Sequence, residues 1–408
     1  MAVMDLTKLL EFGVRQEASD LVIKAGQPPI YRIHGDLLPL RSDNIEPFSA
    51  DDARQTCYGI LSKEQQQEFE DNLELDFAHE IEGLSRFRGN MMVQRGRPTG
   101  VYRTIPWTIR TMEDLGLPEV CQRLADYPRG LVLVTGPTGS GKTTTLAAMI
   151  DYINAAQPVH ILTVEDPVEY VHPCKAALVN QREVHVDTRS FANALKFALR
   201  QDPDVILIGE MRDLETIHLA ITAAETGHLV FGTLHTTDAV QTVDRVIDVF
   251  PPHQQQQVRM QLSVNLVGVL SQALVKTRDL NGRVAAFETM EAIPSIRNMI
   301  REGKTHQIGS TIQTGSRRGM YSLDQSLAAL VKKGIADEDS ARSKATSIEE
   351  YNELLADEKI IEGATTLEAG EGPRTATADA REVAQKQDFQ KRLHQRRSGG
   401  GGGGGGLT

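Results

Sequence analysis

The octapeptide "GPTGSGKT" at residues 136–143 decides the fold of this 408-residue chain. It matches the pattern G-x-x-x-x-G-K-[ST] in full, follows the apolar run "LVLVT", and opens the helix-like run "TTLAAMIDYI". Glycines between a strand and a helix let backbone N–H groups curl around phosphate oxygens, and the helix N-terminus adds positive potential. A glycine-rich turn with a stray lysine, the alternative, does not account for this placement. The stretch therefore predicts a phosphate-binding loop.

The residue types in this loop also predict its ligands. The Lys142 ammonium is expected to bridge the β- and γ-phosphates of a nucleotide, and the Thr143 hydroxyl to ligate Mg²⁺. We therefore predict ATP and Mg²⁺ at this site. The predicted nucleotide-binding residues of the loop are Gly136, Pro137, Thr138, Gly139, Ser140, Gly141, Lys142, Thr143 and Thr144.

Fully apolar runs alternate with helical patterns on both sides of the loop. From Leu131 onward these runs are "LVLVTG", "HILTVED", "DVILIGE" and "HLVFGTLH". Strands that are apolar throughout are buried on both faces, which is typical of a parallel sheet covered by helices. The sequence therefore predicts an α/β core around the phosphate loop.

Acidic residues stand where two of these strands end. Glu210 ends "DVILIGE" and is expected to act as a general base or to orient the attacking water, although Gly209 replaces the aspartate of many P-loop ATPases. Glu165 and Asp166 end "HILTVED" and are expected to join a Mg²⁺–water network, because parallel sheets bind ligands beyond their carboxyl edge. The alternatives are an exposed helix-capping acid and an ordinary Asp–Pro turn.

Changes of pattern divide the rest of the chain. Residues 1–105 predict a small α+β domain, in which "RFRGNMMVQRGRPTGVYRTI" forms two strands around a loop at Gly96–Gly100. Ser347 and Glu350 predict a capping box at the start of a helix. The remaining expected parts are a linker with one helix at 106–125, the nucleotide-binding core at 126–290, a helical part at 291–360 and a disordered tail at 361–408.

Composition disfavours several other classes of protein. A net charge of −11 and 5% aromatic residues disfavour a basic, aromatic nucleic-acid-binding face, so we predict no direct nucleic-acid contact. Asp5 and Lys8 interrupt what would be the apolar part of a signal peptide. The longest membrane-like run, "LSVNLVGVLSQALV", is shorter than the roughly 20 residues of a membrane span. Three cysteines without a C-x-x-C pair predict reduced thiols. We expect a cytoplasmic protein.

Several segments together resemble the secretion-type ATPases. "GPTGSGKT", "TVEDPVEY", "DVILIGEMRDLETI" and "TAAETGHLVFGTLHTTDA" correspond to the Walker A, Asp-box, Walker B and His-box segments of that superfamily, in which Gly before the Walker B Glu is usual. "ASDLVIKAGQPPIYRIHGDL", "LVNQREVHVDT" and "IPSIRNMIREGKTHQI" resemble, more narrowly, the retraction ATPases of type IV pili over roughly residues 4–355. The resemblance implies a PAS-like N-terminal domain, a RecA-like core, and a ring of six subunits that disassembles pilins.

The resemblance also implies roles for residues outside the phosphate loop. His235 and Thr236 would sense the γ-phosphate, whereas His228, at the other end of the same strand, would make a structural hydrogen bond or a subunit contact. Arg88 and Arg103 match arginine-finger positions best, with Arg95, Arg97 and Arg110 in the same region left open. The segment "SIRNMI" would be a partner-docking helix, with Ser295 as its cap, or else a plain amphipathic surface helix. Its predicted docking residues are Ile296, Arg297, Asn298 and Ile300.

The implied partners follow from the same resemblance. They are five further copies of the chain in a homo-hexamer, an inner-membrane pilus platform protein, the pilus machinery, and a second retraction ATPase as a further candidate. Such a motor would be peripheral to the membrane, at its cytoplasmic face. The alternatives are an accessory retraction ATPase, a related secretion or DNA-uptake motor, a nucleic-acid motor, and a regulatory subunit with little turnover. The four-cysteine zinc site of pilus-extension ATPases has no counterpart among these cysteines.

Overall fold

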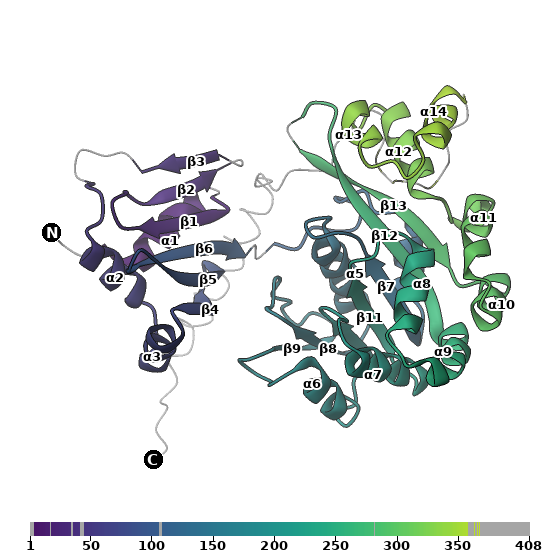
Figure 1. Ribbon diagram of the computed structural model, residues 1–408, viewed down its shortest axis with the longest axis horizontal. Coiled ribbons are helices and arrows are strands. Elements are labelled where there is room, and N and C mark those ends of the chain that lie inside the picture. The colour runs from purple at the N-terminus through teal and green to yellow at the C-terminus, as the bar shows by residue number, and fades with distance from the viewer. Residues whose placement is uncertain are drawn as a thin grey trace, which may run out of the picture.

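Two sheets organise the chain in the computed structural model. The structure describes residues 4–16, 18–33, 36–40, 45–105, 108–280, 282–357, 363, 365 and 367. Figure 1 shows the two units side by side, with the smaller N-terminal unit at the left and a group of C-terminal helices at the top of the larger unit. The α/β character predicted from the sequence is confirmed, and each unit has a core of its own.

The N-terminal unit is an antiparallel sheet with helices packed on it. The order of its strands is β3-β2-β1-β6-β5-β4. Its core joins Leu6 and Leu10 of the first helix to Phe87 and Tyr102 of the sheet, all at most 2% exposed. The elements are α1 (Leu6–Arg15), β1 (Asp20–Lys24), β2 (Ile30–Ile33), β3 (Asp36–Pro39), α2 (Ala50–Tyr58), α3 (Lys63–Asn72), β4 (Glu74–Ile81), β5 (Ser85–Gln94) and β6 (Arg97–Ile105).

The predicted hairpin at residues 86–105 is correct in type but wrong in its loop. β5 and β6 pair from Arg86↔Ile105 to Gln94↔Arg97, so the turn consists of Arg95 and Gly96. Both turn residues have positive φ, 51° and 71°, as a two-residue hairpin turn of this hand requires. Gly100, which we expected in the loop, lies inside β6, where the side chain of Tyr102 occupies the space that a Cβ would need.

The larger unit is built on a seven-stranded sheet in the order β13-β12-β7-β11-β10-β8-β9. All neighbouring strands are parallel except β12 and β13, which form an antiparallel pair. The strands are β7 (Gly130–Thr135), β8 (His160–Glu165), β9 (Leu178–Glu183), β10 (Val205–Ile208), β11 (Leu229–Leu234), β12 (Leu266–Lys276) and β13 (Arg283–Glu291). The predicted parallel core is therefore confirmed.

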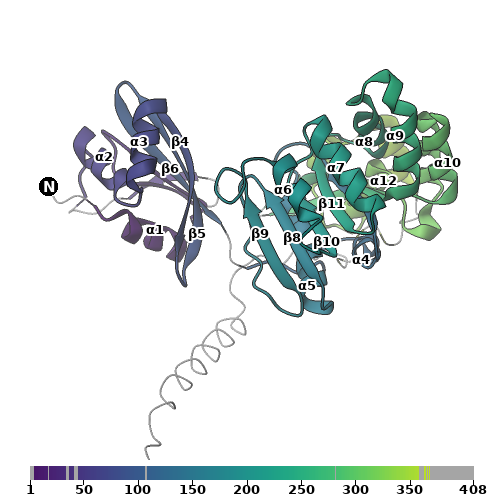
Figure 2. The same cartoon turned by 90° about the horizontal axis from the view of Figure 1, so that it is seen from below.

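Helices cover both faces of this sheet, as Figure 2 shows for α5 and α7 on opposite sides. Alternate residues of β7 separate into two cores, with Leu131 and Leu133 on one side and Val132 and Val134 on the other. The helices are α4 (Glu119–Ala125), α5 (Lys142–Ala156), α6 (Phe191–Ala198), α7 (Leu214–Glu225), α8 (Ala239–Asp248), α9 (Pro252–Asn265), α10 (Pro294–Glu302), α11 (Ile308–Gln313), α12 (Leu323–Lys332), α13 (Glu338–Arg342) and α14 (Ile348–Ala356), with 3₁₀ turns at Thr305–Gln307 and Ser316–Arg318.

The C-terminal part corrects two expectations. Ser347 caps α14 by accepting from the backbone N–H of Glu350, but the Glu350 carboxylate accepts from Gln313 instead of completing a capping box. The predicted disordered tail lies mostly outside the described residues. Thr365 and Leu367 are nevertheless 5% and 6% exposed, because both lie against Gly116 and Leu367 also joins the apolar core around α12 and α14.

The run considered as a membrane span has another structure. "LSVNLVGVLSQALV" divides between the end of α9 and strand β12, and its residues are largely buried within the larger unit. Within the described ranges of the chain, no helix has both the length and the apolar character needed to cross a membrane.

An ion pair with a buried carboxylate joins the two units. Arg86 of β5 donates from Nη2 to the Glu183 carboxylate of β9 at 2.6 Å, and the Glu183 side chain is only 5% exposed. The same carboxylate accepts from the backbone N–H of Val168, in the loop that follows β8. The N-terminal sheet is therefore attached directly to the loop after one of the strands that end at the predicted site.

Candidate active site

The phosphate loop forms where the sequence predicts it, between β7 and α5. Gly136, Gly139 and Gly141 have φ values of 141°, 78° and 88°, which residues other than glycine rarely adopt. Gly141 is the N-cap of α5 and provides no side-chain hydrogen bond there. The first backbone N–H groups of α5 consequently have no cap from within the loop, and the helix dipole favours an anion at this position.

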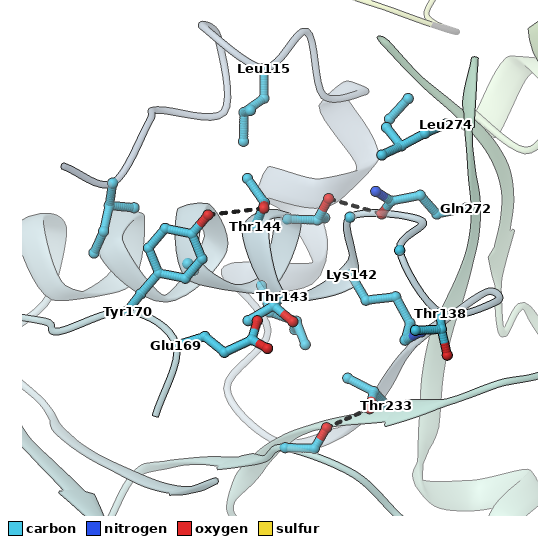
Figure 3. A pocket seen from close by; sticks show the side chains of 18 of the residues that line it. Leu115, Thr138, Lys142, Thr143, Thr144, Glu169, Tyr170, Thr233, Gln272 and Leu274 are labelled. Carbon is cyan, nitrogen blue, oxygen red and sulfur yellow. Dashed lines mark hydrogen bonds between the residues drawn. The ribbon is translucent and has the colours of Figure 1, made fainter. Parts of the chain in front are cut away.

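Eleven of the residues predicted from sequence line one cleft of about 1160 Å³ above this loop (Figure 3). Gly136 and Ser140 are buried in the base of the loop, and neither they nor Pro137, Arg88, His228 and Thr236 line the cleft. The predicted residues that do line it are Arg103, Thr138, Gly139, Gly141, Lys142, Thr143, Thr144, Glu165, Asp166, Glu210 and His235.

Lys142 bends back onto the loop that carries it. Its Nζ donates to the carbonyl oxygens of Gly136 at 2.7 Å and Pro137 at 3.1 Å. Burial lowers the pKa of Lys142, although the nearby carboxylates of Glu210 and Glu169 raise it. The ammonium is therefore placed on the loop that would surround a phosphate chain and can exchange carbonyl oxygens for phosphate oxygens.

Glu210 and His235 meet at the edge of the sheet. His235 Nε2 lies 2.9 Å from Glu210 Oε1, and Arg212 donates from Nη2 to the other carboxylate oxygen at 2.6 Å. Burial raises the pKa of Glu210, but hydrogen bonds and charge from Arg212 and His235 outweigh burial, so the net pKa is below its ordinary value. Glu210 is thus held as a carboxylate, ready to accept a hydrogen bond from water.

Glu165 occupies the most enclosed position among the acids of the cleft. Its side chain accepts hydrogen bonds from Thr163 at 2.7 Å and Gln181 at 3.1 Å, and it is 6% exposed. Burial raises its pKa to about 6, despite those hydrogen bonds, which lower it. A Cβ at Gly209 would lie 3.2 Å from the Glu165 Cα. The strand ends are therefore too close together for an aspartate at position 209 without a shift of the backbone.

Replacing Glu165 by glutamine should stabilise the protein at neutral pH. An acid whose folded pKa is raised binds more protons folded than unfolded, so the unfolding free energy falls as pH rises from 4.5 towards 6. Glu165→Gln removes the cost of ionising a buried carboxyl. We therefore expect the unfolding free energy of the variant to exceed that of the wild-type chain by about 2 kcal/mol at pH about 7.5, and by less at pH about 5. Denaturant unfolding without nucleotide measures both. An equal difference at the two pH values would contradict the assignment.

The oxygen donors of the cleft fit a magnesium ion. Figure 3 places the Thr143 hydroxyl beside Glu169, and Glu165 and Asp166 line the same region. Hydroxyl and carboxylate oxygens are the ligands that Mg²⁺ takes, together with water and phosphate oxygens. No group of three or more His, Cys, Asp or Glu side chains suited to a metal occurs among the described residues. The arrangement fits an ion that shares its coordination with a nucleotide.

The arginines differ in their relation to the cleft. Arg103 lines it while donating from Nε at 2.9 Å to Asp20, a carboxylate that is 6% exposed. Arg88 lies directly across the strand pair from Arg103 and is exposed. Arg110 lines the cleft, unlike Arg95 and Arg97. Of the two best-matching arginine-finger positions, Arg103 therefore lies at the cleft of its own chain and Arg88 does not.

The two histidines of the β11 segment lie at opposite ends of that strand. His228 Nδ1 lies 2.9 Å from the carbonyl oxygen of Ala223 and 3.2 Å from the Thr226 hydroxyl, which places it in a turn after α7. Thr236 Oγ1 lies 2.7 Å from Thr242 Oγ1 of α8 instead of lining the cleft. Of His228, His235 and Thr236, His235 is thus the residue that lines the cleft.

The predicted docking helix requires a correction. Ile296 and Ile300 of α10 are completely buried in the core of their own chain, so their side chains cannot contact a partner here. Arg297 donates to the carbonyl oxygens of Ala292 and Val264 at 2.6 and 2.7 Å, and Asn298 Nδ2 donates to Glu302. The helix begins at Pro294 without a side-chain cap, so Ser295 does not cap it.

Sequence reasoning missed several residues of the cleft. Arg212 holds Glu210, and Tyr170 shares a 3.0 Å hydrogen bond with Thr144. The Thr233 hydroxyl donates to the carbonyl oxygen of Gly209, and Gln272 of β12 lines the cleft beside the loop. Arg212 could have been found from the sequence, because it lies only two residues after the Walker B glutamate. Tyr170, Thr233 and Gln272 belong to other segments of the chain, which only the fold places at the cleft.

A glycine-rich loop between a parallel strand and a helix, with acidic residues at the neighbouring strand ends, defines a P-loop ATPase with a RecA-like core. The family model "Type II/IV secretion system protein" matches residues 111–371. The chain belongs to this family. Nucleotide binding and ATP hydrolysis are accordingly properties of the chain, and the ATPase predicted from the sequence is confirmed.

Individual relatives narrow the comparison. The chain is 54% identical over 348 residues to the type IV pilus retraction ATPase PilT of Pseudomonas aeruginosa, covering 85% of this chain and all of that protein. It is 41% identical over 352 residues to the type IV pilus ATPase PilU of the same organism, covering 86% and 91%. A crystal structure of the pilus retraction motor PilT with bound ADP is 44% identical, with a TM-score of 0.80, over 85% of this chain and 98% of that one.

Proposed function

We propose that this chain is the ATP-hydrolysing motor that powers type IV pilus retraction. The observation that carries the proposal is a complete ATPase site in a chain that is 54% identical to a retraction ATPase along that protein's whole length. Retraction withdraws pili by disassembling pilin, which underlies twitching motility and can serve DNA uptake. Lys142, Thr143 and Glu210 all line the cleft, which favours an active motor over a regulatory subunit.

The cleft suggests how a nucleotide lies in it. The phosphates belong at the loop, where Lys142 and the N-terminus of α5 supply positive potential. The opposite part of the cleft is lined by the apolar side chains of Leu115, Leu117, Leu274 and Ala285, which suit the face of a purine base. Figure 3 shows Leu115 and Leu274 on the far side of the loop from Thr233.

Different residues of the cleft would bind the phosphates, activate the attacking water and hold the metal ion during hydrolysis. Lys142 exchanges its loop carbonyls for phosphate oxygens, and the Glu210 carboxylate, held by Arg212, accepts a hydrogen bond from the attacking water. His235 touches Glu210 and so links the state of the γ-phosphate to the loop after β11. Thr143, Glu165 and Asp166 would hold Mg²⁺ directly or through water, and the ion when bound neutralises phosphate charge.

A homo-hexamer is the assembly that we propose for this motor. Arg103 reaches the cleft from the N-terminal unit, and Arg88 lies exposed beside it on the same sheet. In a ring, Arg88 can serve a neighbouring subunit as an arginine finger while Arg103 serves its own. The ring would act at the cytoplasmic face of the inner membrane, on the pilus platform protein, with a second retraction ATPase as a further partner.

An accessory retraction ATPase is the second candidate. The identity to PilU is 41%, against 54% to PilT over a similar share of the chain, which favours the principal motor. The same chemistry in a secretion motor would differ only in its partner. The distinction therefore requires a measurement in the host cell.

Deletion of the gene in its host tests the proposal. We expect surface pili to accumulate and twitching motility to stop, because pili would still extend but would not retract. Wild-type gene in trans should restore both, whereas a copy with Glu210→Gln should restore neither. Loss of pili after deletion would contradict retraction and indicate an extension motor, and unchanged pili with lost secretion would indicate a secretion motor.

A further inference from the structure

Strand β12 runs beside the phosphate loop, and two of its consecutive residues hold the loop's two flanks. β12 is parallel to β7, with Ser271 directly opposite Thr135, the residue before the loop. The Thr135 hydroxyl donates to Ser271 Oγ at 2.9 Å. Because neighbouring residues of a strand point to opposite faces, Gln272 is directed to the other face, towards α5.

Gln272 is fixed by hydrogen bonds at both ends of its amide. Nε2 donates to the carbonyl oxygen of Ser140 at 2.6 Å. Oε1 accepts from the Thr145 hydroxyl at 2.9 Å, the dashed line at Gln272 in Figure 3. Gln272, Ser140 and Thr145 are each at most 3% exposed. With donor and acceptor both satisfied in a buried place, the amide has one orientation.

The loop is also packed tightly against this residue. A Cβ added at Gly136 would lie 2.3 Å from the Gln272 carbonyl oxygen, and one added at Gly141 would lie 2.8 Å from Nε2. The first and last glycines of the motif are therefore both in close contact with Gln272. No side chain larger than hydrogen fits between them and the strand.

The contact with Ser140 controls the next amide of the loop. In a trans peptide the C=O and N–H groups point in opposite directions. When Gln272 holds the Ser140 carbonyl oxygen inside the protein, the N–H of Gly141 is turned to the opposite side. Gly141 lines the cleft and is the N-cap of α5, where a phosphate would accept a hydrogen bond from this N–H.

We propose that Gln272 is a positioning residue for nucleotide binding. It fixes the Ser140–Gly141 peptide so that the Gly141 N–H is presented to phosphate before nucleotide arrives. Binding then requires no reorganisation of this peptide, which improves affinity. The proposal rests on the nucleotide site proposed above. It extends that site to a strand that lies 132 residues along the chain from the loop.

Gln272→Met in the full-length chain is the principal test. Methionine keeps the length of the side chain but leaves the Ser140 carbonyl and the Thr145 hydroxyl without their partner. We expect the Kd for ADP, measured by calorimetry, and the KM for ATP each to rise ~10-fold or more. The kcat should change much less, since the lost interaction serves ground and transition states alike.

Two further variants separate positioning from stability. Gln325→Met removes two side-chain hydrogen bonds in α12, away from the loop, and should lower Tm while leaving the Kd for ADP unchanged. Gln272→Asn adds no charge but shortens the side chain by one methylene, so that its amide cannot keep the hydrogen bonds to both Ser140 and Thr145, and it should weaken ADP binding as methionine does. It also provides the answer if the methionine variant does not fold.

The outcomes are distinct. Wild-type Kd and KM in both Gln272 variants would overturn the positioning role and leave the ATPase intact. A change of Tm in Gln272→Met with unchanged ADP affinity would also overturn it, in favour of a purely structural residue. Failure of the wild-type chain to bind ADP would instead overturn the nucleotide site itself.

Discussion

Lys142→Ala should lose both nucleotide binding and turnover. The Lys142 ammonium lies on the carbonyl oxygens of Gly136 and Pro137, where it is ready to move onto a phosphate chain. A charged hydrogen bond to phosphate contributes about 1.5–3 kcal/mol, so we expect ATP affinity to fall ~10- to 100-fold. Loss of the charge in the transition state should lower kcat a further ~100- to 1000-fold. Calorimetry with ATP and steady-state phosphate release measure the two effects.

Lys196→Ala is the matched control for this variant. Lys196 lies in α6 and pairs with Glu215 of α7, with both side chains half exposed. Its removal takes away the same side chain without touching the cleft, so binding and turnover should stay at wild-type values. Normal turnover in Lys142→Ala would refute the assignment of the phosphate loop.

Glu210→Gln should bind ATP and hardly hydrolyse it. Glutamine keeps the shape of the side chain and can still face His235 and Arg212, but it removes the negative charge that accepts the proton or hydrogen bond of water. General-base catalysis contributes ~100- to 10,000-fold, and we expect a loss of kcat in this range. ATP affinity should remain within about threefold of wild type, because no phosphate contact is lost.

Glu215→Gln, on the exposed surface of α7, is the control for Glu210→Gln and should hydrolyse ATP normally. If Glu210→Gln hydrolyses ATP near the wild-type rate, then another acid is the base. Glu165 would be the first alternative, since it lines the same cleft with a pKa raised by burial to about 6. The Glu165→Gln variant proposed above for its stability would then lose turnover.

The phosphate loop and the sheet around it could be predicted because their signals are local. A glycine-rich loop needs particular residues at adjacent positions, and buried parallel strands appear as short apolar runs. β12 gave no such signal: α9 ends at Asn265 and the strand starts at Leu266, with no glycine or proline between them. We therefore rejected this run as a membrane span because of its length, but we predicted no strand in it.

Contacts between distant segments could not be predicted from the sequence. Gln272 and Ser140 are 132 residues apart, and the pairing of His235 with Glu210 depends on the order of β10 and β11 in the sheet. The α10 helix shows a different difficulty. Its apolar face has the same spacing whether it meets a partner or its own core, and burial of Ile296 and Ile300 shows that it meets the core.

The Arg86–Glu183 pair makes the two units mechanically dependent. Glu183 is bonded both to Arg86 of the N-terminal sheet and to the loop that follows Glu165 and Asp166. A rotation of the N-terminal unit must therefore either carry that loop with it or break this ion pair. Through this pair, movement of one unit is coupled to the loop that follows Glu165 and Asp166, the acids that would hold the metal.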